Sequence, residues 1–354
     1  MGMILSSGDG KAMSTILDVA KHAGVSKTTV SRYLNGDGPI NALTAQKIKA
    51  AIEELAYTPN YFAQGMRTSK TRTIGIIIPD YSNPFYPELL QGIEDCARLH
   101  GYMTQLSNTQ ADPNAEYDRI EEMVKRQIDG IVLCSYNRIK RDMDYLADVS
   151  GRIPVVIMDP LVRKEPLSYV ITDGCKATIE AVSYLVSIGR KRIGYIKGPS
   201  KLISTGDRFE GYKKGLAANG LPFDKSLVYE ADFSLKSGYA GAEWYVSQGL
   251  PMDALMAATD LMAIGAIKAF NNLKVSIPAQ VAVVGFDNIS LCRIVEPSLT
   301  TIAQPINALG VSAVQIIIDA IESGVFDKKQ IVMEGRLVVR KSTDPAYSER
   351  FDVD

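Results

Sequence analysis

The pattern of apolar and polar positions along the chain changes near residue 73. Before this point the apolar residues recur at helical spacing within short segments, and in one of them Ala45, Ile48, Ile52 and Leu55 form a single stripe. Beyond it, short apolar runs such as "IGIIIP" alternate with longer amphipathic segments. The first pattern predicts a small domain of three helices. The second predicts an α/β fold whose parallel sheets carry helices on both faces.

The three predicted helices are marked by residues that favour helix ends. Thr15, followed three residues later by Asp18, forms a capping-box pattern, and Ser26 and Asn41 precede the other two helices. Gly24 stands between the first two helices, where a turn with positive φ is expected. The spacing therefore predicts a helix, a tight turn and a second helix near the start of the chain.

The second of these helices, "SKTTVSRYLN", is polar on its outer face and turns only Val30 and Leu34 inward. In a helix-turn-helix the second helix lies in the major groove of DNA, with its first turn toward the base edges. Lys27, Thr28 and Arg32 are residue types that read bases, because Lys and Arg donate to guanine and Thr can take either role or touch a thymine methyl group. Side chains suited to phosphate contacts lie on the same helix: Ser26, Thr29, Ser31 and Asn35.

Charge is distributed unevenly, although the net charge of the whole chain is only −1. Between Ser14 and Arg72 there are eight basic and four acidic residues, a balance of +4, which leaves −5 for the remainder. A basic N-terminal part on an acidic body suggests that this part meets a polyanion. The alternative interpretation of this charge is a solvated face, and the alternative for the polar second helix is an exposed helix in some other interaction domain.

Two stretches of the body open in the same way, with "RTIGIIIPD" near residue 72 and "KRIGYIKGP" near residue 191. Alternating helix and strand patterns follow each of them, which predicts two similar lobes in series. The last part contains a strand "LTTIAQP", a helix over residues 306–322 and a strand "RLVVRKS". It predicts that the chain returns to the first lobe and crosses again. Because ligands bind at the carboxyl ends of strands in such sheets, a binding cleft is expected between the lobes.

These patterns divide the chain into four parts. We expect a disordered tail over residues 1–13, a helix-turn-helix domain over 14–58, a linker with a short helical piece over 59–72, and a two-lobed core with a ligand cleft over 73–354. The two lobes of the core are each expected to combine two stretches of chain: about 73–172 and 304–331 for the first, and about 173–303 and 332–354 for the second.

Composition excludes several classes of protein. Hydrophobic residues make up 46% and charged residues 22%, as in soluble proteins, and no apolar run approaches the ~20 residues of a membrane span. The N-terminus lacks a secretion signal, and four cysteines are scattered without a CxxC pair, which favours reduced thiols in the cytoplasm. His22 and His100 have no partners at catalytic or metal-binding spacing, and the common enzyme motifs are absent. We therefore expect no enzyme, no cofactor and no metal.

The stretch "TILDVAKHAGVSKTTVSRYLNG" resembles the N-terminal signature of the lactose/galactose-repressor family of bacterial transcription regulators. The resemblance continues through "AIEELAYTPNYFAQGMRT" and "TIGIIIPDYSNPFYPELLQGIE" and covers nearly everything from Thr15 to Ser342. It implies a hinge helix over Pro59–Arg67 that enters the minor groove, and a core similar to the periplasmic binding proteins. The family usually places a leucine wedge where this chain has Met66, which is apolar and can also wedge. Gly65 beside it is expected to loosen the free hinge.

The resemblance also implies roles for individual residues. Major-groove base readers fall on Lys27, Thr28 and Arg32. Further DNA contacts fall on Thr15, Ser26, Thr29, Ser31, Asn35, Tyr57, Asn60 and Met66. Effector contacts fall on Phe85, Tyr86, Asp173, Arg208, Phe233 and Asp287. At Thr259–Asp260 the family usually has Asn-Asp; because Thr lacks the paired donor and acceptor of an amide, Asp260 is expected to cap a helix rather than bind the effector.

We therefore predict a DNA-binding transcriptional repressor whose operator affinity is controlled by a small effector, a sugar or sugar derivative, in the cleft. One head reads only a half-site, so a homodimer on a near-palindromic operator is expected, and the resemblance places its dimer face on the helix Pro87–Arg98. Two alternatives remain open: a purine-type corepressor regulator, and a sugar-binding protein without a DNA role. A purine needs aromatic stacking and amide readers, whereas Asp173, Arg208 and Asp287 suit hydroxyl groups.

Overall fold

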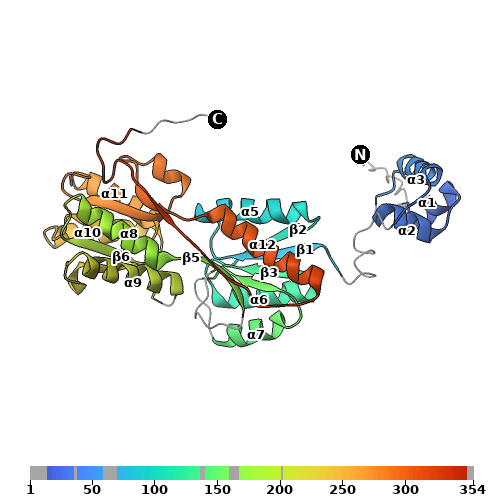
Figure 1. The fold of residues 1–354 in the computed structure, drawn as a ribbon, viewed down its shortest axis with the longest axis horizontal. Coiled ribbons are helices and arrows are strands. Elements are labelled where there is room, and N and C mark those ends of the chain that lie inside the picture. The colour runs from blue at the N-terminus through green and yellow to red at the C-terminus, as the bar shows by residue number, and fades with distance from the viewer. Residues whose placement is uncertain are drawn as a thin grey trace, which may run out of the picture. The chain divides into compact units, whose positions relative to one another are not determined.

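The computed structural model describes residues 14–35, 38–58, 70–135, 140–158, 167–200 and 202–348, with the backbone alone at residues 35 and 140–143. The chain divides into two compact units, Met1–Thr71 and Arg72–Asp354, which we call the head and the core (Figure 1). The expected tail over residues 1–13 and the expected hinge helix Pro59–Arg67 lie outside the described residues.

The described part of the head consists of the helices α1 (Ile16–Ala23), α2 (Lys27–Asn35) and α3 (Ala42–Glu54). The capping box of α1 is present: the Thr15 side chain accepts from the Asp18 N–H, and the Asp18 carboxylate accepts from the Thr15 N–H at 2.8 Å. Gly24 has a φ of 66°. The side chains of Ser26 and Asn41 accept N–H groups in the first turns of α2 and α3. The helix starts predicted from the sequence are therefore confirmed.

A small apolar core joins these helices. Its buried residues are Val19, Ala20, Ala23, Val30, Ile48 and Ala51. Small domains bury a low fraction of their surface, so few side chains contribute fully to hydrophobic stabilisation here. Each side-chain cap contributes about 1 kcal/mol, which makes the caps a sizeable part of the stability of the head.

The described part of the core contains two six-stranded sheets, one in each lobe. The first-lobe sheet is parallel throughout, with the strand order β11-β5-β4-β3-β1-β2. Its strands are β1 (Thr73–Ile78), β2 (Met103–Asn108), β3 (Gly130–Leu133), β4 (Val155–Ile157), β5 (Ser168–Thr172) and β11 (Gln330–Met333). Its helices are α5 (Phe85–Leu99), α6 (Pro113–Lys125), α7 (Lys140–Ser150) and α12 (Ile306–Ser323).

The second-lobe sheet repeats this arrangement, with the order β12-β10-β9-β8-β6-β7. Its strands are β6 (Ile193–Lys197), β7 (Val228–Glu230), β8 (Ala254–Ala257), β9 (Ala282–Asp287), β10 (Thr300–Ala303) and β12 (Arg336–Val338). Its helical segments are α8 (Gly174–Ser187), α9 (Ile203–Ala218), η1 (Lys225–Leu227), α10 (Leu235–Ser247), α11 (Asp260–Asn272) and η2 (Ser290–Arg293). Two similar lobes with parallel sheets confirm the predicted fold class, except that the edge strand β12 runs antiparallel to β10.

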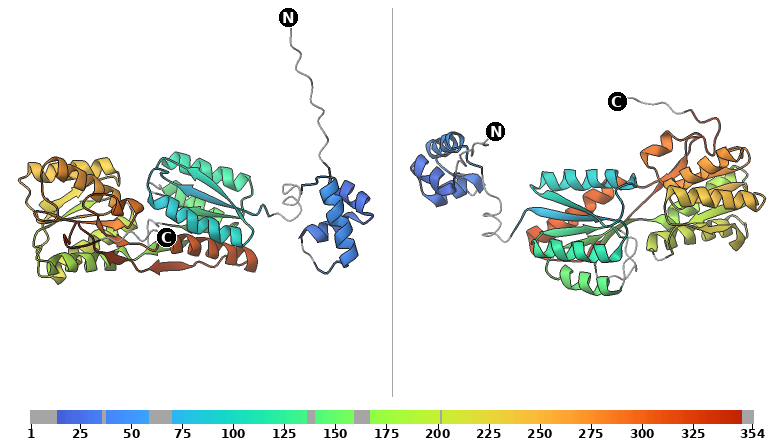
Figure 2. Two further views of the ribbon diagram at one scale, coloured as in Figure 1. Left: turned by 90° about the horizontal axis from the view of Figure 1, so that it is seen from above. Right: turned by 180° about the vertical axis from the view of Figure 1, so that it is seen from behind.

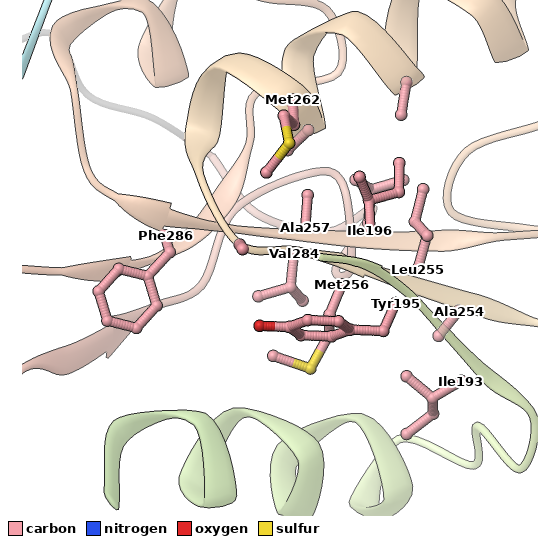
Figure 3. Packing of buried hydrophobic residues seen from close by; sticks show 14 of the residues in the cluster. Ile193, Tyr195, Ile196, Ala254, Leu255, Met256, Ala257, Met262, Val284 and Phe286 are labelled. Carbon is pink, nitrogen blue, oxygen red and sulfur yellow. The ribbon is translucent and has the colours of Figure 1, made fainter. Parts of the chain in front are cut away.

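Alternate residues of the strands pack against helices on opposite faces of each sheet. In β1, Ile76 packs in the cluster that includes α5 and α12, whereas Ile77 packs with α6 and α7. Figure 2 shows α5 and α12 side by side on one face of the first lobe. In the second lobe the Tyr195 ring stacks on Tyr212 of α9, and Figure 3 shows Tyr195 and Met262 on opposite sides of the sheet.

The chain passes between the lobes after β5, after β10 and between β11 and β12. The sequence patterns did not predict α7 or β11. The α7 segment "KRDMDYLADVS" is rich in charge, and the short β11 segment "QIVM" becomes a strand by pairing with the edge of β5.

Helix α12 is long and apolar enough to cross a membrane by length and composition alone. In the core it packs beside α5 and against the first-lobe sheet, where Ile306, Val314, Ile317 and Ile318 are buried. A helix covered from several sides is apolar over most of its surface. Its composition therefore follows from its place in the first lobe.

Candidate DNA-binding helix and effector cleft

Helix α2 turns one polar face outward. Lys27, Thr28 and Arg32 are exposed, whereas Val30 on the opposite face is fully buried. Residues four apart lie above one another on a helix, so Thr28 and Arg32 share a side, with Lys27 next to them. The predicted base readers therefore lie together on one accessible surface.

The other residues predicted to contact DNA have more varied surroundings. The hydroxyl oxygens of Ser26 and Thr29 are 2.8 Å apart, and Thr15 Oγ1 donates to the acid of its own capping box at 2.7 Å, so these hydroxyl groups also serve the helix starts. Ser31 and Tyr57 are half-buried, and Tyr57 packs against the apolar core of the head. Three predicted contacts lie outside the described side chains: Asn35, Asn60 and Met66.

A cleft lies between the two lobes of the core, where the carboxyl ends of several strands meet. It has an empty volume of about 790 Å³, part of which is open to solvent. Large apolar side chains cover much of it: Phe85, Tyr86, Met158, Val170, Leu309 and Phe233. Its neutral polar side chains are Asn83, Ser135, Thr172, Ser204, Thr259 and Gln304. Its charged side chains are Asp207, Arg208 and Asp287.

Arg208, near the start of α9, is held on the second-lobe side of the cleft. Its Nη1 donates to the carbonyl oxygen of Ala258 at 2.5 Å, and its Cζ lies 3.8 Å from the centroid of the Phe286 ring. Its Nη2 is 3.9 Å from Asp287 Oδ1, which makes a loose ion pair. Its Nε is buried and makes no hydrogen bond within the described structure. The guanidinium is thus fixed in orientation by neighbours of its own lobe.

Asp287 ends β9 and is 5% exposed. Gln304 Nε2 donates to its Oδ1 at 2.6 Å. Burial raises the pKa of Asp287 to about 7; Arg208 opposes this effect, and the neighbouring Asp260 carboxylate adds to it. The Asp287 carboxyl therefore titrates near neutral pH.

A buried polar network behind the cleft holds the loop that follows β9. Asp287 and Asn288 have φ values of 127° and 65°, which residues other than glycine rarely adopt. Arg340 Nη2 donates to Asn288 Oδ1 at 2.7 Å, and the Ile289 N–H donates to Asp260 Oδ2 at 2.9 Å. Asp260 and Arg340 therefore fix the direction in which Asp287 leaves the strand.

The expectation that Asp260 caps a helix was wrong. The N-cap of α11 is Thr259, whose side chain accepts from the Met262 N–H at 3.4 Å. Asp260 is instead fully buried, accepts from the Thr301 hydroxyl at 2.5 Å, and has its pKa raised by burial. A carboxylate is used here because the loop after β9 and the hydroxyl on β10 both need an acceptor.

The structure brings most of the predicted effector residues into the cleft: Phe85, Tyr86, Arg208, Phe233 and Asp287. Asp173 is not among the lining residues. Because β5 ends at Thr172 and α8 begins at Gly174, the Asp173 side chain is placed to cap the helix, and its Oδ1 accepts from the Lys176 N–H at 3.0 Å.

Sequence reasoning missed several lining residues, among them Ser135, Thr172, Asp207 and Gln304. Thr172 ends β5, and Ser135 and Gln304 follow closely behind β3 and β10. The rule that ligands bind at the carboxyl ends of parallel strands could have indicated these three. Asp207 lies on α9 next to Arg208, and no local pattern marks it.

A basic helix-turn-helix head joined to a two-lobed core with a cleft defines a class: a DNA-binding regulator that carries a ligand-binding domain. Residues 15–60 match the bacterial regulatory proteins of the lacI family, and residues 182–343 match the periplasmic binding protein-like domain. The chain belongs to the lacI family of bacterial regulatory proteins.

Individual relatives agree with this assignment over nearly the whole chain. Catabolite control protein A of Priestia megaterium is 33% identical, over 93% of this chain and 99% of that protein. A crystal structure of the Lac repressor dimer bound to operator and the anti-inducer ONPF matches with a TM-score of 0.84 at 26% identity, over 94% of this chain and 99% of that one. A complex of the transcriptional regulator CelR with cellobiose matches with a TM-score of 0.71 at 29% identity, over 93% and 99%.

These relatives are transcriptional regulators and not enzymes. The family and the class of function predicted from the sequence are thereby confirmed. The protein is a DNA-binding transcriptional regulator.

Proposed function

We propose that the core binds a sugar or sugar derivative in the cleft and that this binding controls repression through the head. The observation that carries the proposal is the Arg208–Asp287 pair, which faces the cleft beside Phe85 and Phe233. Guanidinium and carboxylate groups make directional hydrogen bonds to hydroxyl groups, and aromatic rings cover the apolar faces of a sugar. The CelR complex with cellobiose supports this choice of effector.

Two hydroxyl groups on the first-lobe side extend the polar surface of the proposed site. Ser135 Oγ and Thr172 Oγ1 are buried, and neither makes a hydrogen bond within the described structure. A buried polar group without a partner costs about 1–3 kcal/mol. An effector hydroxyl that pairs with either group removes this cost, so both are part of the proposed site.

For the head, we propose that Lys27, Thr28 and Arg32 read operator bases and that the surrounding hydroxyl groups contact phosphates. A single head reads a half-site, so the protein acts as a homodimer on a near-palindromic operator. The Lac repressor dimer bound to operator supports this arrangement. We place the dimer face on the helix Pro87–Arg98, and the protein, as a regulator of bacterial genes, in the cytoplasm.

Effector and operator binding are coupled in this proposal by a population shift. A ligand that contacts both walls of the cleft favours the lobe arrangement in which the walls approach, because only that arrangement makes both sets of contacts. The head joins the core through the first lobe, at the start of β1. A change in how two first lobes face each other in a dimer therefore changes the spacing of the two heads.

A thermal-shift screen of sugars, sugar phosphates and purines tests the effector proposal. A sugar that binds the folded core raises its melting temperature, because binding to the native state stabilises it by mass action. Arg208→Ala should abolish the shift while leaving the unliganded protein folded. A shift produced by purines and by none of the sugars would replace the proposal with the purine-type alternative.

A further inference from the structure

We infer that the cleft selects an uncharged or cationic sugar over a phosphorylated or carboxylated one. The inference rests on the proposed function and specifies the charge of the effector. It is carried by the charges of the described lining residues, the surroundings of the one arginine among them, and the way the surrounding helices begin.

Negative charge outweighs positive charge among the described lining residues. Asp207 and Asp287 contribute two carboxylates, and Arg208 contributes one guanidinium. A third carboxylate, Asp260, lies close enough to raise the pKa of Asp287. A phosphate ester brings a further charge of about −1.5 to −2 at neutral pH, which these groups repel at the low effective dielectric of a closed cleft.

Arg208 has little capacity left for an anionic group. Its Nη1 donates to the Ala258 carbonyl oxygen, its Nη2 lies 3.9 Å from Asp287 Oδ1, and one face of the guanidinium covers Phe286. A bidentate grip on a phosphate or carboxylate needs two parallel N–H groups directed at it. The Nε–Nη2 edge of Arg208 makes no hydrogen bond within the described structure, but Nε is buried and the Asp287 carboxylate lies 3.9 Å from Nη2, so an anion at this edge would meet a carboxylate already there.

Helix starts are the other common anion sites in proteins, because their N–H groups are unpaired. Three helices that begin at the cleft use their own side chains for this purpose. Asn83 Oδ1 accepts from the Phe85 N–H at the start of α5, Asp173 caps α8, and Thr259 caps α11. Helix α9 begins without a side-chain cap but carries Asp207 in its second turn, and this carboxylate disfavours an anion there.

Two hydroxyl groups on the first-lobe side of the cleft, both unpaired within the described structure, are suited to the hydroxyl groups of a sugar. Ser135 Oγ and Thr172 Oγ1 can each donate and accept, as can the hydroxyl groups of a neutral sugar. A dianionic phosphate offers acceptors only. The lining that the structure describes thus provides partners for a polyol and few donors for an anion.

Calorimetric titration of the full-length protein at pH 8, where Asp287 is largely ionised, tests the inference. The probes are glucose, galactose, ribose and cellobiose, the phosphate esters glucose 6-phosphate, galactose 1-phosphate and ribose 5-phosphate, and 6-amino-6-deoxyglucose, whose primary amine is protonated at this pH, as the cation. We expect the affinity for a neutral sugar to exceed that for its phosphate ester by at least about 10-fold, or 1.4 kcal/mol.

Charge variants separate repulsion from shape. Asp207→Asn should lower the ratio of the affinity for a neutral sugar to the affinity for its phosphate ester, because it removes one carboxylate with little change in volume. Glu243→Gln, an equal change of charge on the exposed face of α10, should leave the preference unchanged. Melting curves without ligand confirm that both variants fold.

The possible outcomes distinguish failure of the charge selection from failure of the proposed sugar effector. A phosphate ester that binds as tightly as its neutral sugar, or more tightly, overturns the charge selection and leaves the sugar proposal in place. A preference unaffected by Asp207→Asn also overturns it, because shape alone then explains the selection. If no sugar of either kind binds the folded protein, the proposed effector class fails and the inference fails with it.

Discussion

At the scale of single residues, the chemistry of the cleft depends on how Asp287 is held. Backbone conformations in sparsely populated regions cost about 1–3 kcal/mol each and persist only when neighbours determine them. Here Gln304 binds the carboxylate, Arg340 binds the next side chain, and Asp260 binds the N–H group after that. The same burial that fixes Asp287 raises its pKa to about 7, so its ionisation is linked to folding.

This linkage gives a pH dependence with a definite sign. The folded protein binds the Asp287 proton more tightly than the unfolded chain, whose carboxyl has the ordinary pKa of 3.8. The stabilisation is therefore complete below about pH 4 and is lost as pH rises through about 7. As the pH rises, the free energy of unfolding of the wild type should therefore fall relative to that of the Asp287→Asn variant. The slope of this difference should be at most about 1.4 kcal/mol per pH unit.

Urea unfolding of both proteins between pH 4.5 and pH 8 measures this difference. Asp260, whose pKa is also raised by burial, contributes in the same direction and remains in both proteins. Because the two carboxyl groups interact, the difference between the proteins reports the titration of Asp287 together with its effect on Asp260. If the plots of unfolding free energy against pH ran parallel for the two proteins, Asp287 would have the same pKa in the folded and unfolded states.

At the scale of elements, three helix pairs of the core approach one another through glycine. In α5 and α12, a methyl group added to Gly92 would lie 2.2 Å from the Asn307 carbonyl oxygen. In α10 and α11, one added to Gly238 would lie 2.1 Å from the Met262 carbonyl oxygen. In α8 and α9, one added to Gly211 would lie 2.4 Å from the Cys175 carbonyl oxygen. These helices pack backbone against backbone, which fixes their positions beside the sheets.

The closest of these contacts should not tolerate a side chain. Gly238→Ala forces α10 and α11 apart, and we expect a loss of at least about 1–3 kcal/mol in the free energy of unfolding. Gly206→Ala is the matched control, because within the described residues nothing beyond its own helix backbone and chain neighbours lies within 4 Å of the added methyl group. Alanine is favoured over glycine inside a helix by about 0.5–1 kcal/mol, so the control should be slightly stabilised. Equal effects of the two substitutions on urea unfolding would contradict the packing argument.

At the scale of the whole molecule, the head and the core are separate compact units. The head holds its own apolar cluster and caps, and the core holds both sheets and the whole cleft. In the core, Lys176 Nζ on α8 lies 2.6 Å from the carboxylate of Glu334, which stands between β11 and β12. This ion pair joins the segment that follows β5 to the segment between β11 and β12, two of the places where the chain passes between the lobes. The residues proposed to recognise DNA and those proposed to recognise a ligand therefore lie in different units.

Substitutions confined to the outer face of α2 should consequently affect one activity alone. Lys27→Ala, Thr28→Ala and Arg32→Ala together should abolish sequence-specific binding to DNA, because each base contact contributes roughly 1–3 kcal/mol of discrimination. The thermal shift with the effector should remain, since these side chains are exposed and lie in the other unit.

Binding is measured on a fragment that the wild-type protein enriches from a random DNA pool. Lys47→Ala and Lys49→Ala serve as a control for charge, because both lysines are exposed on α3 and were not predicted to read bases. A triple variant that still prefers the enriched fragment over an unrelated one would remove α2 from base recognition.

Much of this protein follows from short-range features of its sequence. Helix caps at Thr15, Ser26 and Asn41, the polar face of α2 and the apolar runs of the strands act within a few residues, so the head and the two α/β lobes were predictable. The segments α7 and β11 were missed because their form depends on the sheet they pack against or pair with.

Tertiary structure decided the composition of the cleft. Ser135, Thr172 and Gln304 are far apart in the sequence and meet only because parallel strands end at one edge and the chain crosses between the lobes. The family resemblance implied an effector contact for Asp173. Because this residue alone separates β5 from α8, its side chain caps the helix. The sequence by itself determined most of the elements and the class of protein, because these rest on local periodicity and motif. The partners of each polar group depend on contacts between distant segments, which only the folded chain brings within hydrogen-bonding distance.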